Sequence, residues 1–218
     1  MLLVSIVITL LMLYCAYIIV VNQRFVSNNF SYANNDKTQY RKFRFEPRKV
    51  VVVDGLQDGI ILISDSISVE ISNEDISAFH SEVVNDTLRL AFDNMARGRA
   101  YLYLPNGLQL VVDSSSLEMR GSLDYRYLPE YDLKLRSSSL LASGHDTHTF
   151  VGKLAVTASG NSRLNIARYF HINELDLHNV HDATFAQGWQ IGNLKTSYED
   201  GTNVVMDKYR DSVAIRPL

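Results

Sequence analysis

The amino-acid sequence predicts an all-β fold, a stacked β-solenoid that follows an N-terminal transmembrane helix. Three observations predict this fold. Pairs of apolar residues recur about every twenty residues between Tyr101 and Met206. The segment before them consists of short β-branched runs separated by turns, with no amphipathic stretch long enough to be a helix. The chain begins with an uncharged run from Leu2 to Val21.

The composition limits the possible classes of partner. A chain of 218 residues fits one domain, or one domain with an appendage. The formal net charge of −3 gives no argument for binding to nucleic acid, so we predict no nucleic-acid partner. The chain has one cysteine, Cys15, so no disulfide can form within it.

Residues 1–21 are predicted to be a transmembrane signal anchor. At about 1.5 Å per residue, an apolar helix of this length spans the core of a bilayer, about 30 Å. A cleaved signal peptide is the alternative, but no small-x-small cleavage site follows Val21. The resulting prediction is a single-pass protein of a bacterial inner membrane, with its domain on the periplasmic, extracytoplasmic side. The positive-inside rule opposes this orientation, because Arg24 and Lys37 follow the run and no basic residue precedes it.

Residues 22–44 are predicted to be a tether, because the stretch from Asn22 to Asp36 is polar, rich in asparagine and without a period. The basic residues between Arg41 and Arg44 alternate with aromatic ones. They fit the face of a first strand, or a contact with lipid headgroups. Residues 45–218 are predicted to form the β-solenoid domain.

The first part of that domain contains several strand-like runs. Val50–Val53 is a β-branched run that ends at the turn Asp54-Gly55. Ile67, Val69 and Ile71 alternate with polar residues, as expected of a strand with one buried face. Further strands are expected at residues 60–63, 88–90 and 101–104.

The second part repeats. We expect each repeat to contribute two strands, whose apolar residues point inward while their neighbours point outward. Gly152, Asn173 and Gly192 precede three of the first strands and are predicted to form corners. Stacking the strands would align Asp132, Lys153, Glu174 and Asn193 on one outward row, without like charges side by side. The first pairs are Leu110/Val112, Leu133/Leu135, Leu154/Val156, Leu175/Leu177 and Leu194/Thr196, and the second pairs are Leu117/Met119, Leu140/Ala142, Leu164/Ile166, Ala183/Phe185 and Val204/Met206.

A succession of strand and turn patterns runs through the domain. These patterns are Lys49–Asp54, Gly59–Ile63, Ile67–Ile71, Asn85–Leu90, Arg99–Leu104 followed by Pro105, Leu108–Val112 and Ser114–Met119. Through this order of patterns, rather than through invariant chemistry, roughly residues 45–206 resemble the head GIN domain family, adhesin-like domains of the bacterial cell envelope that are common in Bacteroidetes-type bacteria. The resemblance implies a right-handed, single-stranded β-helix, an exported location and no known catalytic residues.

Two groups of residues are candidate sites. His178, His181 and Asp182 are weak candidates for a divalent metal site, provided that a corner brings both histidines to one ion. The alternative is that these corner residues bond to the backbone of the turn, as the serine runs are expected to do. Tyr125, Tyr127 and Tyr131 around Arg126 form a possible partner surface, or alternatively a cap or part of the core.

The predicted function is a binding, adhesin-like or structural module without a cofactor, whose ligand is a protein or a polysaccharide. A carbohydrate-acting enzyme is one alternative, for which Asp113 and Glu118 would be the paired carboxylates. A scaffold that self-associates as a homo-oligomer through an open end is the other alternative. Val213 and Ile215 fit a last strand that covers such an end. No catalytic constellation is evident, so we do not expect an enzyme.

Overall fold

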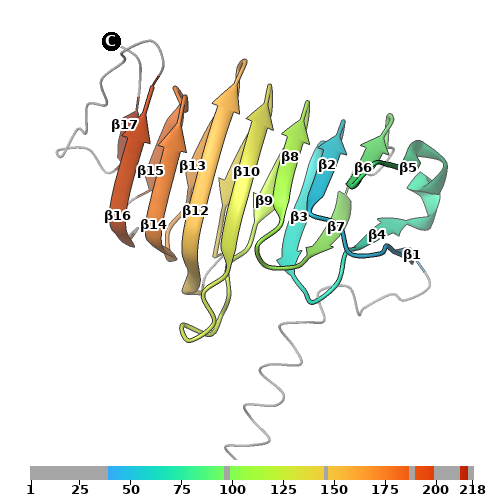
Figure 1. Ribbon diagram of the computed structural model, residues 1–218, viewed down its shortest axis with the longest axis horizontal. Helices are drawn as coiled ribbons and strands as arrows, with labels where there is room; N and C mark the ends of the chain where they lie inside the picture. The colour runs from blue at the N-terminus through green and yellow to red at the C-terminus, as the bar shows by residue number, and fades with distance from the viewer. Residues whose placement is uncertain (1–38, 96–98, 145–146, 187–189, 199–211, 216–218) are drawn as a thin grey trace, which may run out of the picture. The chain divides into compact units, whose positions relative to one another are not determined.

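The strands of this protein belong to two mixed sheets (Figure 1). The structure, a computed structural model, describes residues 39–95, 99–144, 147–186, 190–198 and 212–215. The nine-stranded sheet has the order β1 (Tyr40–Arg44), β4 (Ser68–Ser72), β7 (Arg99–Leu104), β3 (Asp58–Ile63), β9 (Ser116–Met119), β11 (Ser139–Ala142), β13 (Arg163–Ile166), β15 (Ala183–Ala186) and β17 (Ser212–Ile215). The eight-stranded sheet has the order β16 (Gln190–Ser197), β14 (Phe170–His178), β12 (Thr149–Ser159), β10 (Glu130–Arg136), β8 (Gln109–Asp113), β2 (Val50–Asp54), β6 (Thr87–Phe92) and β5 (Phe79–Val84).

The predicted all-β content is confirmed, but the predicted right-handed single-stranded β-helix is wrong. The chain forms two mixed sheets rather than a closed solenoid, because several segments reverse direction. Strands β4 and β7, β5 and β6, and β15 and β17 pair antiparallel. The order in space also departs from the order in sequence, since β2 lies between β6 and β8, and β3 lies between β7 and β9.

One hydrophobic core contains residues of both sheets. Strand β10 shows the pattern clearly: Tyr131, Leu133 and Leu135 are buried, while Glu130 before them and Asp132 between them are exposed. The same alternation buries Val51 and Val53 of β2 completely. Burying each such side chain is worth about 1.5–3 kcal/mol, which makes the alternation the main determinant of which face turns inward.

The parallel pairings predicted for the repeats are confirmed except at one place. Leu110 pairs with Leu133, and Leu140 pairs with both Leu117 and Leu164, as expected. Between β10 and β12, however, Leu133 pairs with Val156 instead of Leu154. The register there differs by two residues from the predicted one. The partner of Lys153 is consequently Glu130, not Asp132. The predicted pair Val204/Met206 lies outside the described residues.

The predicted corners are also corrected. Gly152, Asn173 and Gly192 lie within β12, β14 and β16, where the ladder of paired residues skips them. The corners that follow β8, β10, β12 and β14 contain residues with positive φ instead, which are Ser114, Ser137, Gly160 and Asn179. Their backbone N–H groups, as at Ser114 and Ser137, donate to carbonyls of the next repeat at 3.0 and 3.1 Å. In this chain a corner is therefore marked by the serine, glycine or asparagine that follows the first strand of each repeat.

Buried serines connect the corners of successive repeats. Ser115, Ser138 and Ser162 are each at most 5 % exposed. The Ser138 hydroxyl accepts from the backbone N–H of Ser115 at 3.1 Å and lies 2.7 Å from the carbonyl of Arg136, to which it donates. The Ser162 hydroxyl accepts in the same way from the N–H of Ser138 at 3.3 Å. The serine runs thus bond to turn backbone, as predicted.

Replacing Ser138 by alanine is expected to lower the free energy of unfolding by about 1–3 kcal/mol, because the buried N–H of Ser115 would lose its acceptor. Chemical denaturation followed by fluorescence measures this loss. The matched control is Ser159→Ala, an exposed serine with a single long bond of 3.4 Å to the carbonyl of Leu135. The control should change stability by less than about 0.5 kcal/mol. Equal losses in the two variants would show that the serines do not connect the corners.

The predicted membrane location is corrected as well. Within the described residues, no helix is long and apolar enough to cross a bilayer, and the one helical element among them is the short η1 (Asn73–Ala78). The described residues therefore give no support to the predicted single-pass inner-membrane protein. The predicted anchor, residues 1–21, and most of the predicted tether lie outside the described residues. The end of that tether, Tyr40–Arg44, forms β1, as the alternation of basic and aromatic residues indicates.

Candidate functional site

Five ring side chains form a continuous row, which we call the ring strip: Tyr125, His148, Phe150, Tyr169 and His171. The Phe150 and His171 rings stack with their centroids 4.9 Å apart, and His171 stacks on His148 at the same distance. Tyr169 meets the edge of His148 at 5.0 Å, and Tyr125 meets Phe150 at 6.4 Å. These distances lie within the range of favourable aromatic contacts.

Strand pairing explains how four of these rings meet. Phe150 of β12 and His171 of β14 are direct partners in the parallel ladder. His148 and Tyr169 each lie two residues earlier, and therefore on the same face as Phe150 and His171. The residues between them, Thr149 and Phe170, are buried. The alternation thus assigns the rings to the outer face and leaves the inner face to the core.

The fifth ring comes from the connection between β9 and β10, residues 120–129, which we call the 120–129 loop. It projects beyond the ends of the strands in Figure 1. The backbone of Ser122 pairs with that of Phe150 in an isolated bridge, with N–H to carbonyl distances of 2.9 and 2.8 Å. The N–H of Gly152 donates to the carbonyl of Pro129 at 2.9 Å. The loop is therefore attached to β12 at both ends.

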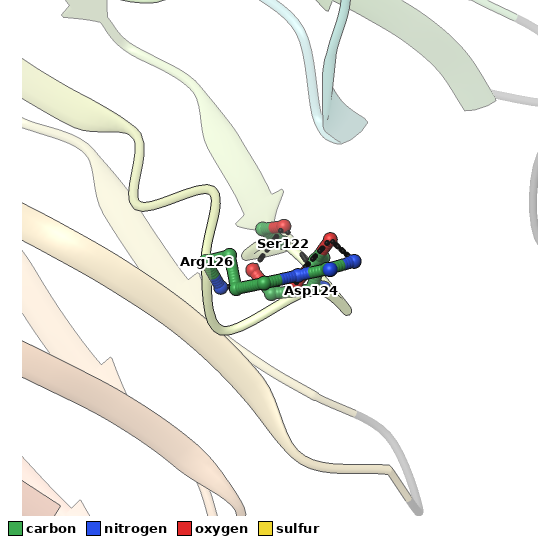
Figure 2. Close-up of polar contacts among 3 residues, drawn as sticks. All are labelled: Ser122, Asp124 and Arg126. Atoms are coloured by element: carbon green, nitrogen blue, oxygen red, sulfur yellow. Dashed lines mark hydrogen bonds and ion pairs between the residues drawn. The ribbon is translucent and has the colours of Figure 1, made fainter.

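Its own polar side chains fold the loop into a fixed turn (Figure 2). The hydroxyl of Ser122 accepts from the N–H of Asp124 at 3.1 Å. The Asp124 carboxylate accepts from Arg126 at three donors: the backbone N–H at 3.0 Å, Nε at 3.0 Å and Nη2 at 2.8 Å. The N–H of Tyr127 closes the turn by donating to the carbonyl of Asp124 at 3.0 Å.

This turn presents large apolar side chains to solvent. Tyr125 is 68 % exposed and Leu123 is 46 % exposed, and the two remaining residues of this kind in the loop, Tyr127 and Leu128, are exposed as well. A loop whose polar groups bond to each other while its apolar groups face water is typical of a binding surface. Its hydrogen bonds also reduce the conformational entropy that binding would otherwise cost.

At the far end of the ring strip, Tyr169 has a φ of +62°. A bulky residue in this left-handed region costs about 1–2 kcal/mol in backbone strain. The carbonyl of Tyr169 accepts from the N–H of Thr149 at 2.9 Å, which holds the strained residue beside β12. Strained residues of this kind cluster at binding sites, where the surrounding structure maintains them.

Arg126 lowers the pKa of Asp124, first through the side-chain hydrogen bonds and second through the backbone N–H of Arg126. Because the folded-state pKa is depressed, the turn is fully stabilised above the ordinary carboxyl pKa of about 3.9. This stabilisation is lost as the pH falls from there through the lower, folded-state pKa. We therefore expect the loop to be unchanged between pH 7 and about 5 and to lose its fixed turn only below about pH 3.9.

An NMR titration that follows the side-chain carboxyl carbon of Asp124 and the amide of Arg126 tests this expectation. In Arg126→Gln, the midpoint of Asp124 should move up toward the ordinary carboxyl pKa. The carboxylate of Glu174 provides the internal control, since its pKa is lowered independently by hydrogen bonds from Lys153 and Lys195. An Asp124 midpoint that does not respond to Arg126→Gln would contradict the proposed cause.

The candidate metal residues make separate contacts. His178 Nδ1 lies 2.8 Å from the hydroxyl of Ser197, and the ring of His181 packs 5.3 Å from that of Tyr198. The Asp182 carboxylate forms an ion pair with Arg163 at 2.9 Å. Within the part of the chain that the structure describes, no cluster of three or more histidine, cysteine, aspartate or glutamate residues is arranged to hold a metal ion.

The four residues of the predicted partner surface divide into two groups. Tyr125, Arg126 and Tyr127 are exposed together on the 120–129 loop, whereas Tyr131 is 5 % exposed and belongs to the core. Burial raises the pKa of the Tyr131 hydroxyl above its ordinary value. The different placement follows from the alternation along β10, in which Tyr131 lies two residues before the inward Leu133 and therefore on the same buried face.

The two carboxylates considered for glycoside cleavage lie on different sheets. Asp113 ends β8 of the eight-stranded sheet, and Glu118 belongs to β9 of the nine-stranded sheet. Glu118 forms an ion pair with Arg120 at 3.1 Å. Neither carboxylate belongs to the ring strip or to the 120–129 loop.

No family model and no curated protein matches this chain. Among the solved structures to which the chain is similar are three that are each named "putative adhesin". The first, from Parabacteroides distasonis, is 16 % identical with a TM-score of 0.44, and the match covers 73 % of this chain and 77 % of that one. The second, from Parabacteroides merdae, is 12 % identical with a TM-score of 0.39 and coverages of 75 % and 78 %. The third, from Bacteroides fragilis, is 10 % identical with a TM-score of 0.36 and coverages of 73 % and 94 %.

Proposed function

We propose that this chain is a non-catalytic binding module of the adhesin type, and that its ligand lies on the 120–129 loop and the adjoining ring strip. The observation that carries the proposal is the fixed turn at Asp124 and Arg126, which holds Tyr125 and Tyr127 in solvent. The resemblance of the sequence to the head GIN domain family supports a cell-envelope role of the same kind.

The composition of this surface favours a protein as the ligand. Tyrosine and arginine are enriched at the energetic centres of protein interfaces, and lysine, glutamate and aspartate are depleted there. The loop exposes Tyr125, Tyr127 and Arg126, and its one acidic residue, Asp124, is neutralised by Arg126. Leu123 and Leu128 add apolar area that has no hydrogen bonds to offer the hydroxyl groups of a polysaccharide.

A retention assay tests this proposal. Beads are coated with the full chain, and the probe is envelope fragments from cells of the organism that carries the gene; the amount of fragments retained on the beads is measured. Substituting Tyr125 and Tyr127 together by alanine should weaken retention of the fragments by about tenfold or more, because residues at such centres cost about 2 kcal/mol or more when truncated. The matched control replaces Val83 and Val84, the exposed apolar pair of β5, by serine and should leave retention unchanged.

Treatment of the fragments separates the ligand classes. Loss of retention after protease digestion supports a protein ligand, whereas loss only after periodate oxidation identifies a polysaccharide ligand instead. Equal retention by wild type and the double tyrosine variant would contradict the proposed surface. Size-exclusion chromatography of the same variants also tests self-association as a homo-oligomer, which stays a prediction.

A further inference from the structure

Two histidines of the ring strip direct ring nitrogens at each other. His148 Nδ1 and His171 Nε2 are 2.6 Å apart. His148 immediately precedes β12 and His171 is the second residue of β14, so the two side chains project from neighbouring segments of the same sheet. Both rings lie on the outer face, where water and ions have access.

From this geometry we propose that His148 and His171 form a two-ligand site for a divalent transition-metal ion such as Zn²⁺. Imidazole nitrogens are suitable ligands for zinc, copper and nickel. With metal–nitrogen bonds of about 2.0–2.1 Å, two ligands of one ion lie about 2.9 Å apart at a right angle and about 3.4 Å apart in a tetrahedron. The two nitrogens, now 2.6 Å apart, would therefore have to separate by about 0.3 Å for right-angled and by about 0.8 Å for tetrahedral coordination of one ion.

The neighbouring rings hold this pair in place. His148 lies against Tyr169 on one side and His171 on the other, and His171 in turn stacks on Phe150. These contacts orient both ligands before an ion arrives, which is the role that supporting groups have in known metal sites. Water would occupy the remaining coordination positions of the ion, because the structure describes no third ligand residue grouped with the two histidines.

A hydrogen bond between two neutral imidazoles is the competing explanation of the short distance. The two explanations differ in what metal does to the protein. A bound ion would connect the segment before β12 with β14 and stabilise the folded state, whereas a hydrogen-bonded pair gains nothing from added metal.

Isothermal titration of the full chain with zinc chloride tests the proposal. We expect one ion to bind per chain, and His148→Ala and His171→Ala each to weaken binding by more than about tenfold. His178→Ala is the matched control, since His178 contacts Ser197 instead, and it should keep the wild-type affinity. Zinc should also raise the thermal midpoint of wild type and not that of the double histidine variant.

Nitrogen-15 NMR of the imidazole rings keeps the test valid if a variant fails to fold. In wild type, zinc should shift Nδ1 of His148 and Nε2 of His171 and leave the ring of His178 unchanged. Absence of saturable binding, or binding that both single variants retain, would overturn the site. The proposal does not rest on the binding function proposed above, because the titration contains no ligand other than the metal.

Discussion

Replacing Phe170 by alanine is expected to lower the free energy of unfolding by about 3–5 kcal/mol. Phe170 is completely buried, and it is among the largest side chains that the core contains. It lies on the inner face of β14 between the outward residues Tyr169 and His171. Truncation would remove its transfer free energy and leave a cavity that β12 and β14 can close only in part. Equilibrium unfolding in guanidinium chloride measures the loss.

The neighbouring substitution His171→Ala is the matched control. It changes the next residue of the same strand but removes a ring from the outer face, so its cost should stay below about 1 kcal/mol. The pair of variants separates the two faces of β14: the inner face maintains the fold, and the outer face carries the ring strip. Similar losses in both variants would show that the ring strip is part of the structural core.

Alternation between apolar and polar residues is the reliable signal in the sequence. It predicted the strands, most of their partners and the inward residues, because each inward leucine contributes more than any polar contact on the surface. The error at β10 and β12 arose from residue identity. Leucine pairs were matched with each other, whereas the structure aligns Leu135 with Ala158, a small residue that gives a weak apolar signal.

The absence of like charges side by side on the outward row could not detect this error. A shift by two residues keeps every side chain on its face, since the period of a strand is two. In the structure the partner of Lys153 is Glu130 instead of the predicted Asp132. Both residues are acidic, so the row has no like charges side by side in either register. Lys153 pairs with Glu174 and contacts its carboxylate at 3.1 Å, and Glu174 pairs with Asn193, so the rest of the row is as predicted.

The fold class could not be predicted from the repeats, because the repeats do not include the strands that reverse direction. Strand β5 pairs antiparallel with β6 through a turn at Asn85, whose φ is +57°. At the other end, β17 runs against β15. A last strand at Val213 and Ile215 was expected, but the alternation of apolar residues along a strand does not fix the direction in which the strand runs.

The ring strip was missed for a different reason. Its members come from three segments of the chain, and no local pattern marks a contact between segments about twenty residues apart. One signal was available. His148 and Phe150 flank the inward residue Thr149, and Tyr169 and His171 flank Phe170, so two successive repeats carry rings at the same outward positions. Rings at matching outward positions of successive repeats are therefore the feature of the sequence that predicts this part of the ring strip.

Replacing Gly55 by alanine is expected to lower the free energy of unfolding by at least about 3 kcal/mol, for two reasons that add. Gly55 follows β2 with a φ of +76°, a conformation that costs a residue with a Cβ about 1–2 kcal/mol. In addition, a Cβ at this position would lie against the carbonyl oxygen of Phe92, so the backbone after β6 would have to move. The N–H of Gly55 donates to the carbonyl of Asp113 at 3.1 Å, which keeps the turn from shifting away.

Gly107→Ala separates the two causes. Gly107 has nearly the same φ, +75°, but a Cβ there would meet nothing within 4 Å. This variant should therefore lose only the conformational cost of about 1–2 kcal/mol. Chemical denaturation of both variants measures the difference, which reports the contact between the turn at Gly55 and Phe92 alone. If the two variants lost the same stability, backbone conformation would explain both, and the close packing of β2 against β6 at this turn would contribute nothing.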